Sequence, residues 1–223
     1  ISEATGRKPT IADAGLPALV YHDLMDNNAA FNSAISDYIL NSRYRMIDQF
    51  EYSSREEYIT ARQKYGVNSY YKDMDGRPVF CKSDEESRLC DYLGRHGIHF
   101  RYEEKYEYDT ADKDFRQYCP DFSIYFMGED GKQRRVYLEH FAVNAQGHCP
   151  HWFSTEEEQK YLEGIDWKRN VHKAHGTILL ESRSADFHDG DVFLKLERQL
   201  HSLGIRTDNG RRNDLFREIA RQE

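Results

Sequence analysis

Apolar residues recur at helical spacing in several stretches of the chain, and the flanking residues supply start and stop signals. Ser54-Arg55-Glu56-Glu57 and Ser154-Thr155-Glu156-Glu157 are capping-box sequences. Gly97 and Gly176 follow two of the stretches, where a glycine is typical of a helix end. The predicted helices cover residues 14–50, 54–66, 83–96, 154–175, 191–203 and 214–221.

Between these stretches the chain is rich in aromatic and β-branched residues, which is typical of strands. Strands are predicted at residues 98–108, 121–126, 134–141 and 177–181, and a short hairpin at 68–81 around Asp75-Gly76. From residue 83 onward the order is α-β-β-β-α-β. This order predicts an α/β fold with a central mixed sheet of about four strands flanked by helices. We expect a helical N-terminal extension (1–67), the main domain (68–206) and a C-terminal helical tail (207–223).

Composition narrows the class of protein. The chain has 223 residues and a formal net charge of −8, which counts against an autonomous DNA binder despite basic pairs such as Arg134-Arg135. No apolar run approaches the roughly 18 residues of a membrane span. Four cysteines without a C-x-x-C pair indicate neither a zinc framework nor a disulfide scaffold, so we expect a reduced, cytoplasmic protein. The start at Ile1 rather than Met suggests an excised piece.

Three acidic residues fall at informative places in the predicted order. Glu86 lies in the first turns of the helix before the sheet, Asp121 follows Pro120 at a strand start, and Glu139 lies near the end of an apolar strand. A carboxylate buried there costs several kcal/mol unless it is paired or binds a metal. Together the three would form an oxygen-rich site suited to Mg²⁺ or Mn²⁺, which can acidify a water molecule and neutralise phosphate charge.

These acidic residues belong to a longer ordered set of motifs. The set is Lys82-Ser83-Asp84-Glu85-Glu86, Pro120-Asp121-Phe122, Glu139-His140-Phe141, and Trp167-Lys168-Arg169 with Gly176-Thr177. Over about residues 50–205 the chain resembles the PD-(D/E)XK nuclease module of UvrD-like superfamily 1 DNA helicases of the helicase IV kind. The resemblance implies a restriction-endonuclease-like core. It also implies that DNA is a partner, together with a superfamily 1 helicase motor in the same polypeptide or in contact with it.

The resemblance further implies a role for each matching residue. Asp121 and Glu139 would be the principal Mg²⁺ or Mn²⁺ ligands, Glu86 a third ligand directly or through water, and the backbone carbonyl of His140 a further one. Lys168 would be the catalytic lysine, with Lys173 in reserve. The family pattern has a lysine two residues after the strand acid, where this chain has Phe141, so the lysine would come from the following helix. The implied activity is metal-dependent hydrolysis of DNA phosphodiesters.

Other interpretations remain open. Glu86 also completes a capping box with Ser83. The acidic charge and the absence of a lysine at position 141 favour a non-catalytic module that binds DNA structures or other parts of the helicase, and a self-standing restriction or defence nuclease is a further rival. The run His148-Cys149-Pro150-His151 suggests zinc, but its spacing matches no standard structural site. The chain has no G-x-x-x-x-G-K-[ST] phosphate loop, so it is not a P-loop motor by itself.

Overall fold

The computed structural model describes residues 47–65, 68–111 and 116–207, together with Leu24, Asn27, Asn28 and Phe31. Residues 46–209 form one compact unit, and the description below concerns that unit. The predicted helix at 214–221 and most of the predicted helix at 14–50 lie outside the described residues.

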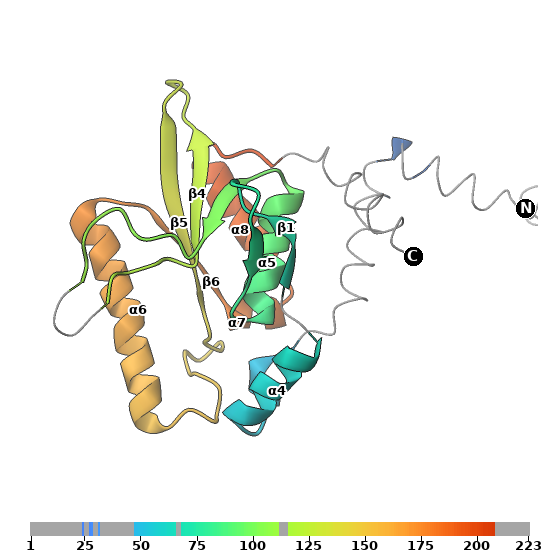
Figure 1. Ribbon diagram of the computed structural model, residues 1–223, viewed down its shortest axis with the longest axis vertical. Helices are drawn as coiled ribbons and strands as arrows, with labels where there is room; N and C mark the ends of the chain where they lie inside the picture. The colour runs from blue at the N-terminus through green and yellow to red at the C-terminus, as the bar shows by residue number, and fades with distance from the viewer. Residues whose placement is uncertain are drawn as a thin grey trace, which may run out of the picture. The chain divides into compact units, whose positions relative to one another are not determined.

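Four strands form the central sheet, in the order β3 (His99–Tyr102), β4 (Phe122–Met127), β5 (Gln133–Phe141) and β6 (Leu179–Arg183). The first three strands are antiparallel neighbours, whereas β6 runs parallel to β5 and is reached through the long helix α6 (Thr155–His175) (Figure 1). The predicted order α-β-β-β-α-β and the mixed α/β class are both confirmed.

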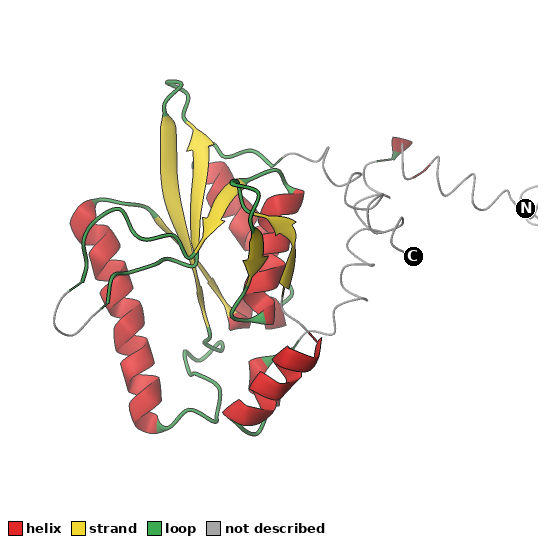
Figure 2. Ribbon diagram, in the orientation of Figure 1, coloured by secondary structure: helices red, strands yellow, loops and turns green. Residues whose placement is uncertain are grey.

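Helices cover both faces of the sheet (Figure 2). Successive side chains of β5 alternate between the larger apolar cluster on one face and two smaller clusters on the other. Val136 and Leu138 of β5 join the larger cluster with α5 (Asp84–Arg95) and α8 (Val192–Ser202). Tyr137 and Phe141 of the same strand instead join clusters that contain residues of α6. This period of two follows from the pleat of a strand, which points successive side chains to opposite faces.

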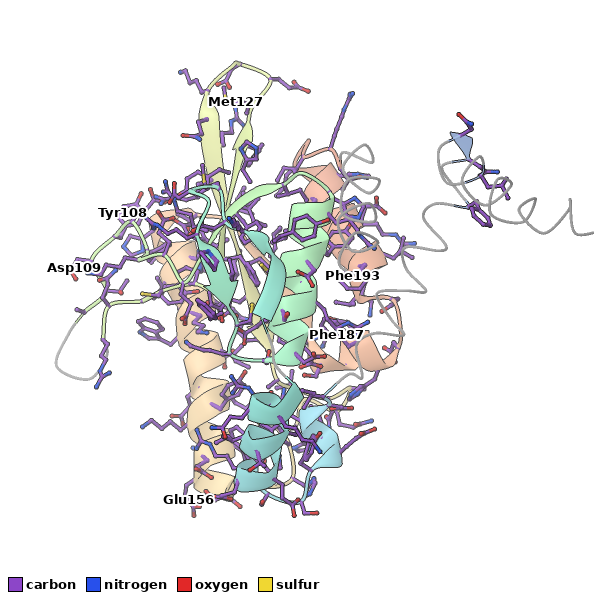
Figure 3. All side chains as sticks on the ribbon, turned by 45° about the vertical axis from the view of Figure 1, so that its right-hand side comes forward. Tyr108, Asp109, Met127, Glu156, Phe187 and Phe193 are labelled. Carbon is purple, nitrogen blue, oxygen red and sulfur yellow. The ribbon has the colours of Figure 1, made fainter. Side chains whose placement is uncertain are left out.

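Smaller elements extend the larger cluster. The hairpin of β1 (Asn68–Lys72) and β2 (Pro78–Phe80) packs beside α5 through Tyr71, which lies against Gly94. After β6, the short helix α7 (Ser184–His188) places Phe187 against Phe193 of α8, with ring centroids 5.9 Å apart (Figure 3). No helix within the described part of the chain has the length and apolar character needed to cross a bilayer.

Local signals placed the helix ends correctly. Ser54 and Ser154 each accept a hydrogen bond from the backbone N–H three residues on, which begins α4 (Arg55–Tyr65) and α6. Gly97 and Gly176 adopt φ of 71° and 67°, the left-handed conformation that glycine allows after a helix. The glycine stops and the capping box at Ser154 are therefore confirmed. At Ser54 only half of the box forms, because the Glu57 carboxylate accepts the N–H of Ser53 instead.

Two predicted boundaries were wrong. The strand predicted at 98–108 ends at Tyr102, because Glu103 has φ 49°, which takes the backbone out of the extended conformation. The long helix predicted to reach Phe50 does not: Ile47 and Asp48 are not helical, and Gln49–Glu51 is a separate 3₁₀ turn, η2. There the Asp48 side chain accepts the N–H of Phe50 and competes with helix continuation.

The loop between β5 and α6 is anchored to α4 through Trp152. Its ring lies 6.1 Å from that of Tyr58, and its indole N–H donates to the Gln49 carbonyl at 3.0 Å. Ile47 and Ala61 complete this small cluster. Trp152 is thus a hydrophobic anchor that ties this loop to α4.

Candidate functional site

The two strand carboxylates of the predicted site lie on neighbouring strands. The antiparallel register pairs Phe122 of β4 with Leu138 of β5, so Asp121, the residue before β4, comes opposite Glu139. Opposed residues share one face of the sheet, with Cβ atoms about 5 Å apart. Asp121 is held there because its carboxylate accepts the backbone N–H of His140 at 2.8 Å. The sheet therefore brings these two acidic residues together.

Glu139 is fully buried, with no solvent-exposed surface. The Tyr118 hydroxyl donates to one of its oxygens at 2.6 Å, and the Lys168 ammonium donates to the other at 2.5 Å. Burial and the negative charge of Asp121 raise the pKa of Glu139 to about 8, although Lys168 and Tyr118 oppose that rise. Glu139 is therefore a buried acid with an elevated pKa and a cation beside it, which is typical of a functional carboxylate.

Lys168 reaches the sheet from α6. Its ammonium lies 5.6 Å from the ring centroid of Phe141 and 5.8 Å from that of Tyr118, so two aromatic faces flank the charge. Burial disfavours its charged form, but Glu139 and Asp121 outweigh this and raise the pKa of Lys168 above its usual value. The inward orientation expected of Lys168 is confirmed. Lys173, the reserve candidate, is exposed on the same helix.

Glu86 lies at the first turn of α5 and is held by local donors. Its carboxylate accepts hydrogen bonds from the Lys82 N–H at 3.2 Å, from the Ser83 hydroxyl at 3.1 Å and from the Tyr102 hydroxyl. Ser83 in turn accepts the Glu86 N–H at 3.1 Å, so the capping interaction expected of Ser83 is present. Burial, followed by the negative charge of Asp121, raises the pKa of Glu86. Asp121 is thus an electrostatic neighbour of both other acids.

Within the described residues, no three His, Cys, Asp or Glu side chains are grouped closely enough to hold a metal ion. Each predicted ligand has a protein donor instead: Lys168 and Tyr118 for Glu139, the His140 N–H for Asp121, and Tyr102 for Glu86. The chemistry of the three carboxylates fits a hard cation such as Mg²⁺ or Mn²⁺. Their use as ligands, and that of the His140 carbonyl, stay predictions.

A second buried polar network lies on the opposite face of β5, and sequence reasoning missed it. The His140 side chain lies 2.9 Å from Glu85 through Nε2 and 3.0 Å from the Ser182 hydroxyl through Nδ1. Burial favours the neutral forms, but each partner offsets this: the pKa of Glu85 is lowered and that of His140 is raised. Ser182 is only 3% exposed, so this Ser-His-Glu chain holds the sheet together and is closed to a substrate.

Tyr118 was also missed as a contributor to the candidate site. It lies in the irregular segment before β4, packs in the cluster of Tyr106 and Tyr137, and directs its hydroxyl at Glu139. The signal available in the sequence was its position three residues before Asp121. A loop residue has no periodicity that would point its side chain inward.

The side chains of the histidine-rich segment before α6 have separate surroundings. His148 pairs with Glu158 at 2.9 Å, whereas Cys149 is buried among Phe141, Val143 and Ile165. His140 is occupied by Glu85 on the far face of β5.

No protein-family model, curated protein or solved structure matches the chain. The fold and the site must therefore be interpreted from their own residues.

Proposed function

We propose that this chain is a metal-dependent nuclease module of the PD-(D/E)XK type that hydrolyses DNA phosphodiesters and works with a superfamily 1 helicase motor. The observation that carries the proposal is the contact of Lys168 with Glu139 beside Asp121. Two strand-end carboxylates and one helix lysine thus meet in the arrangement that the resemblance implies. The α-β-β-β-α-β order supports a restriction-endonuclease-like core.

In this proposal Asp121 and Glu139 hold a Mg²⁺ or Mn²⁺ ion, with Glu86 as the third acid. The bound ion supplies positive charge to the phosphate and acidifies a water molecule. Tyr118 keeps Glu139 in place through its hydrogen bond. Lys168, which now contacts Glu139, would donate to a phosphate oxygen and offset charge in the transition state.

The second candidate is a non-catalytic module that binds branched or frayed DNA or another part of the helicase. A specific observation favours it: the Lys168 ammonium already contacts Glu139 at 2.5 Å, where a metal ion would have to bind. The net charge of −8 points the same way. Under this hypothesis the Glu139–Lys168 pair is a structural remnant that holds α6 on the sheet.

Cleavage of end-labelled single-stranded, duplex and forked DNA with Mg²⁺ or Mn²⁺ separates the two candidates. Asp121→Asn and Lys168→Met should each abolish cutting, because the first removes a ligand charge and the second the transition-state cation. Lys173→Met is the matched control, since it removes an exposed lysine from the same helix, and it should cut like the unaltered protein. If concentrated unaltered protein cuts none of the substrates, the binding module becomes the better account.

A further inference from the structure

A basic cavity lies at the free edge of the central sheet, one strand away from the candidate site. Its volume is about 350 Å³, and its lining includes the side chains of Glu181 on β6 and Gln199 on α8. Gln199 accepts the N–H of Glu181 at 3.3 Å and donates to its carbonyl at 3.1 Å. The side chain thus covers the edge of β6 where a further strand would otherwise pair.

The lining carries more positive than negative charge, in a chain whose net charge is −8. Two acidic residues, Glu181 and Asp186, face four basic ones: Arg169, Arg183, Lys195 and Arg198. An excess of positively charged side chains around a cavity attracts an anion.

Two of the four basic residues are already committed to acidic partners. Arg169 makes a two-point contact with Glu181, at 2.8 and 2.7 Å, and Lys195 lies 2.8 Å from Asp186. These pairs neutralise both acids of the lining. They therefore define the walls of the cavity and leave the remaining charge to the other two residues.

Arg183 and Arg198 supply the remaining positive charge. Arg183 forms an ion pair with Asp186 at 3.7 Å, longer than a hydrogen bond, and its side chain is 48% exposed. Arg198 is exposed on α8 and has no ion pair or hydrogen bond within the part of the chain that the structure describes. Guanidinium groups bind phosphate oxygens through two parallel hydrogen bonds, which makes these two exposed arginines well suited to backbone phosphates.

The cavity is also well placed with respect to the candidate site. The parallel register pairs Glu181 of β6 with Glu139 of β5, so the two carboxylates are neighbours on the α6 face of the sheet. Adjacent strands are about 4.8 Å apart. The neighbouring residues Lys168 and Arg169 of α6 bind these two carboxylates in turn. A single bound nucleic-acid strand can therefore contact both the cavity and the Asp121–Glu139 site.

We infer that Arg183 and Arg198 each bind a backbone phosphate of a nucleic-acid strand and hold that nucleic-acid strand beside the Asp121–Glu139 site. The inference rests on the proposed function for the identity of the ligand, but the cavity and its free charge do not depend on catalysis. It makes the β6 edge the place where this acidic protein binds the phosphates of a nucleic-acid strand.

The test is the affinity of the full chain for a labelled single-stranded oligonucleotide, measured by fluorescence anisotropy in EDTA so that no cutting occurs. Arg183→Gln with Arg198→Gln should weaken binding about tenfold and lower the slope of log Kd against log salt by about 1.4, which is about 0.7 for each phosphate contact to a single strand. Arg77→Gln with Arg134→Gln is the charge-matched control on exposed arginines. Equal effects of the two double variants would overturn the inference.

Further arms identify the ligand. Arg198→Gln alone should lower the salt slope by about 0.7. Because Arg198 is exposed, this variant keeps the test valid if the double variant fails to fold. Arginine-dependent binding of inorganic phosphate as tight as that of DNA, or displacement of DNA by polyglutamate, would overturn the nucleic-acid assignment. Cleavage and arginine-dependent binding are scored separately. Arginine-dependent binding without cleavage would contradict the nuclease proposal alone, whereas cleavage without arginine-dependent binding would contradict this inference alone.

Discussion

Replacing Lys168 by methionine removes the cation beside a fully buried carboxylate and keeps most of the side-chain volume. Glu139 has no exposed surface, and the Lys168 side chain is 30% exposed. Breaking a buried ion pair by removing one partner typically costs about 3–5 kcal/mol, because the remaining charge has no compensation. A buried carboxyl can escape part of that cost by keeping its proton. The loss in stability should therefore depend on pH.

The sign follows from the raised pKa of Glu139, about 8 against an unfolded value near 4.5. The folded protein binds the extra proton, so both proteins lose Glu139-linked stability as the pH rises from about 4.5 to 8. Above 8 the unaltered protein pairs the ionised Glu139 with Lys168, whereas the variant has no partner for it. Lys168→Met should cost about 1 kcal/mol at about pH 5, from lost packing and hydrogen bonding, and about 3 kcal/mol at about pH 9.

Urea denaturation followed by far-UV circular dichroism at the two pH values measures both losses. Lys173→Met, exposed on the same helix, should change stability by less than about 0.5 kcal/mol at either pH. A loss for Lys168→Met that is equal at both pH values would refute the reasoning, because it would show that Glu139 does not carry the charge that Lys168 offsets. A control loss of the same size would refute it too.

Three further predictions concern the surrounding structure. Burial lowers the pKa of His172 to about 4, so the protein should lose up to about 3 kcal/mol as the pH falls from 6.5 to 4, and urea titrations of His172→Gln should show a flatter profile. Gly94→Ala should destabilise by about 1–3 kcal/mol in thermal melts, because a Cβ would lie 2.2 Å from Tyr71, and this overlap outweighs the gain of about 1 kcal/mol in helix propensity; a stabilised variant would contradict the packing. Tyr118→Phe should cost about 1–3 kcal/mol in urea denaturation by removing a donor to Glu139, and an unchanged midpoint would contradict that contact.

Much of the secondary structure was readable from local signals. Ser54 and Ser154 begin α4 and α6, Gly97 and Gly176 follow the ends of α5 and α6, and Asp75-Gly76 lies in the turn of the first hairpin. These features depend on hydrogen bonds within a few residues and on the φ angles that glycine allows. The exception is the strand that was expected to continue to residue 108. It ends before Glu103, whose positive φ the amino-acid composition of the segment did not predict.

The candidate site was partly predictable. Asp121 and Glu139 stood out because carboxylates at the ends of apolar strands need a partner, and strands joined by a short hairpin pair in a register that the turn restricts. Lys168 followed only from the resemblance, and its contact with Glu139 spans 29 positions of the chain. Nothing within one turn of α6 specifies which of its lysines faces the sheet.

The local pattern of residues was therefore sufficient for most helices and strands, for the α/β class and for two acids of the site. Tertiary packing alone decided that Tyr118 and Lys168 share Glu139, that His140 pairs with Glu85 across 55 positions, and that Arg183 and Arg198 line one cavity. The reason is physical: hydrogen bonds near in sequence are set by backbone geometry, whereas distant side chains meet only after the sheet and helices have buried their apolar faces.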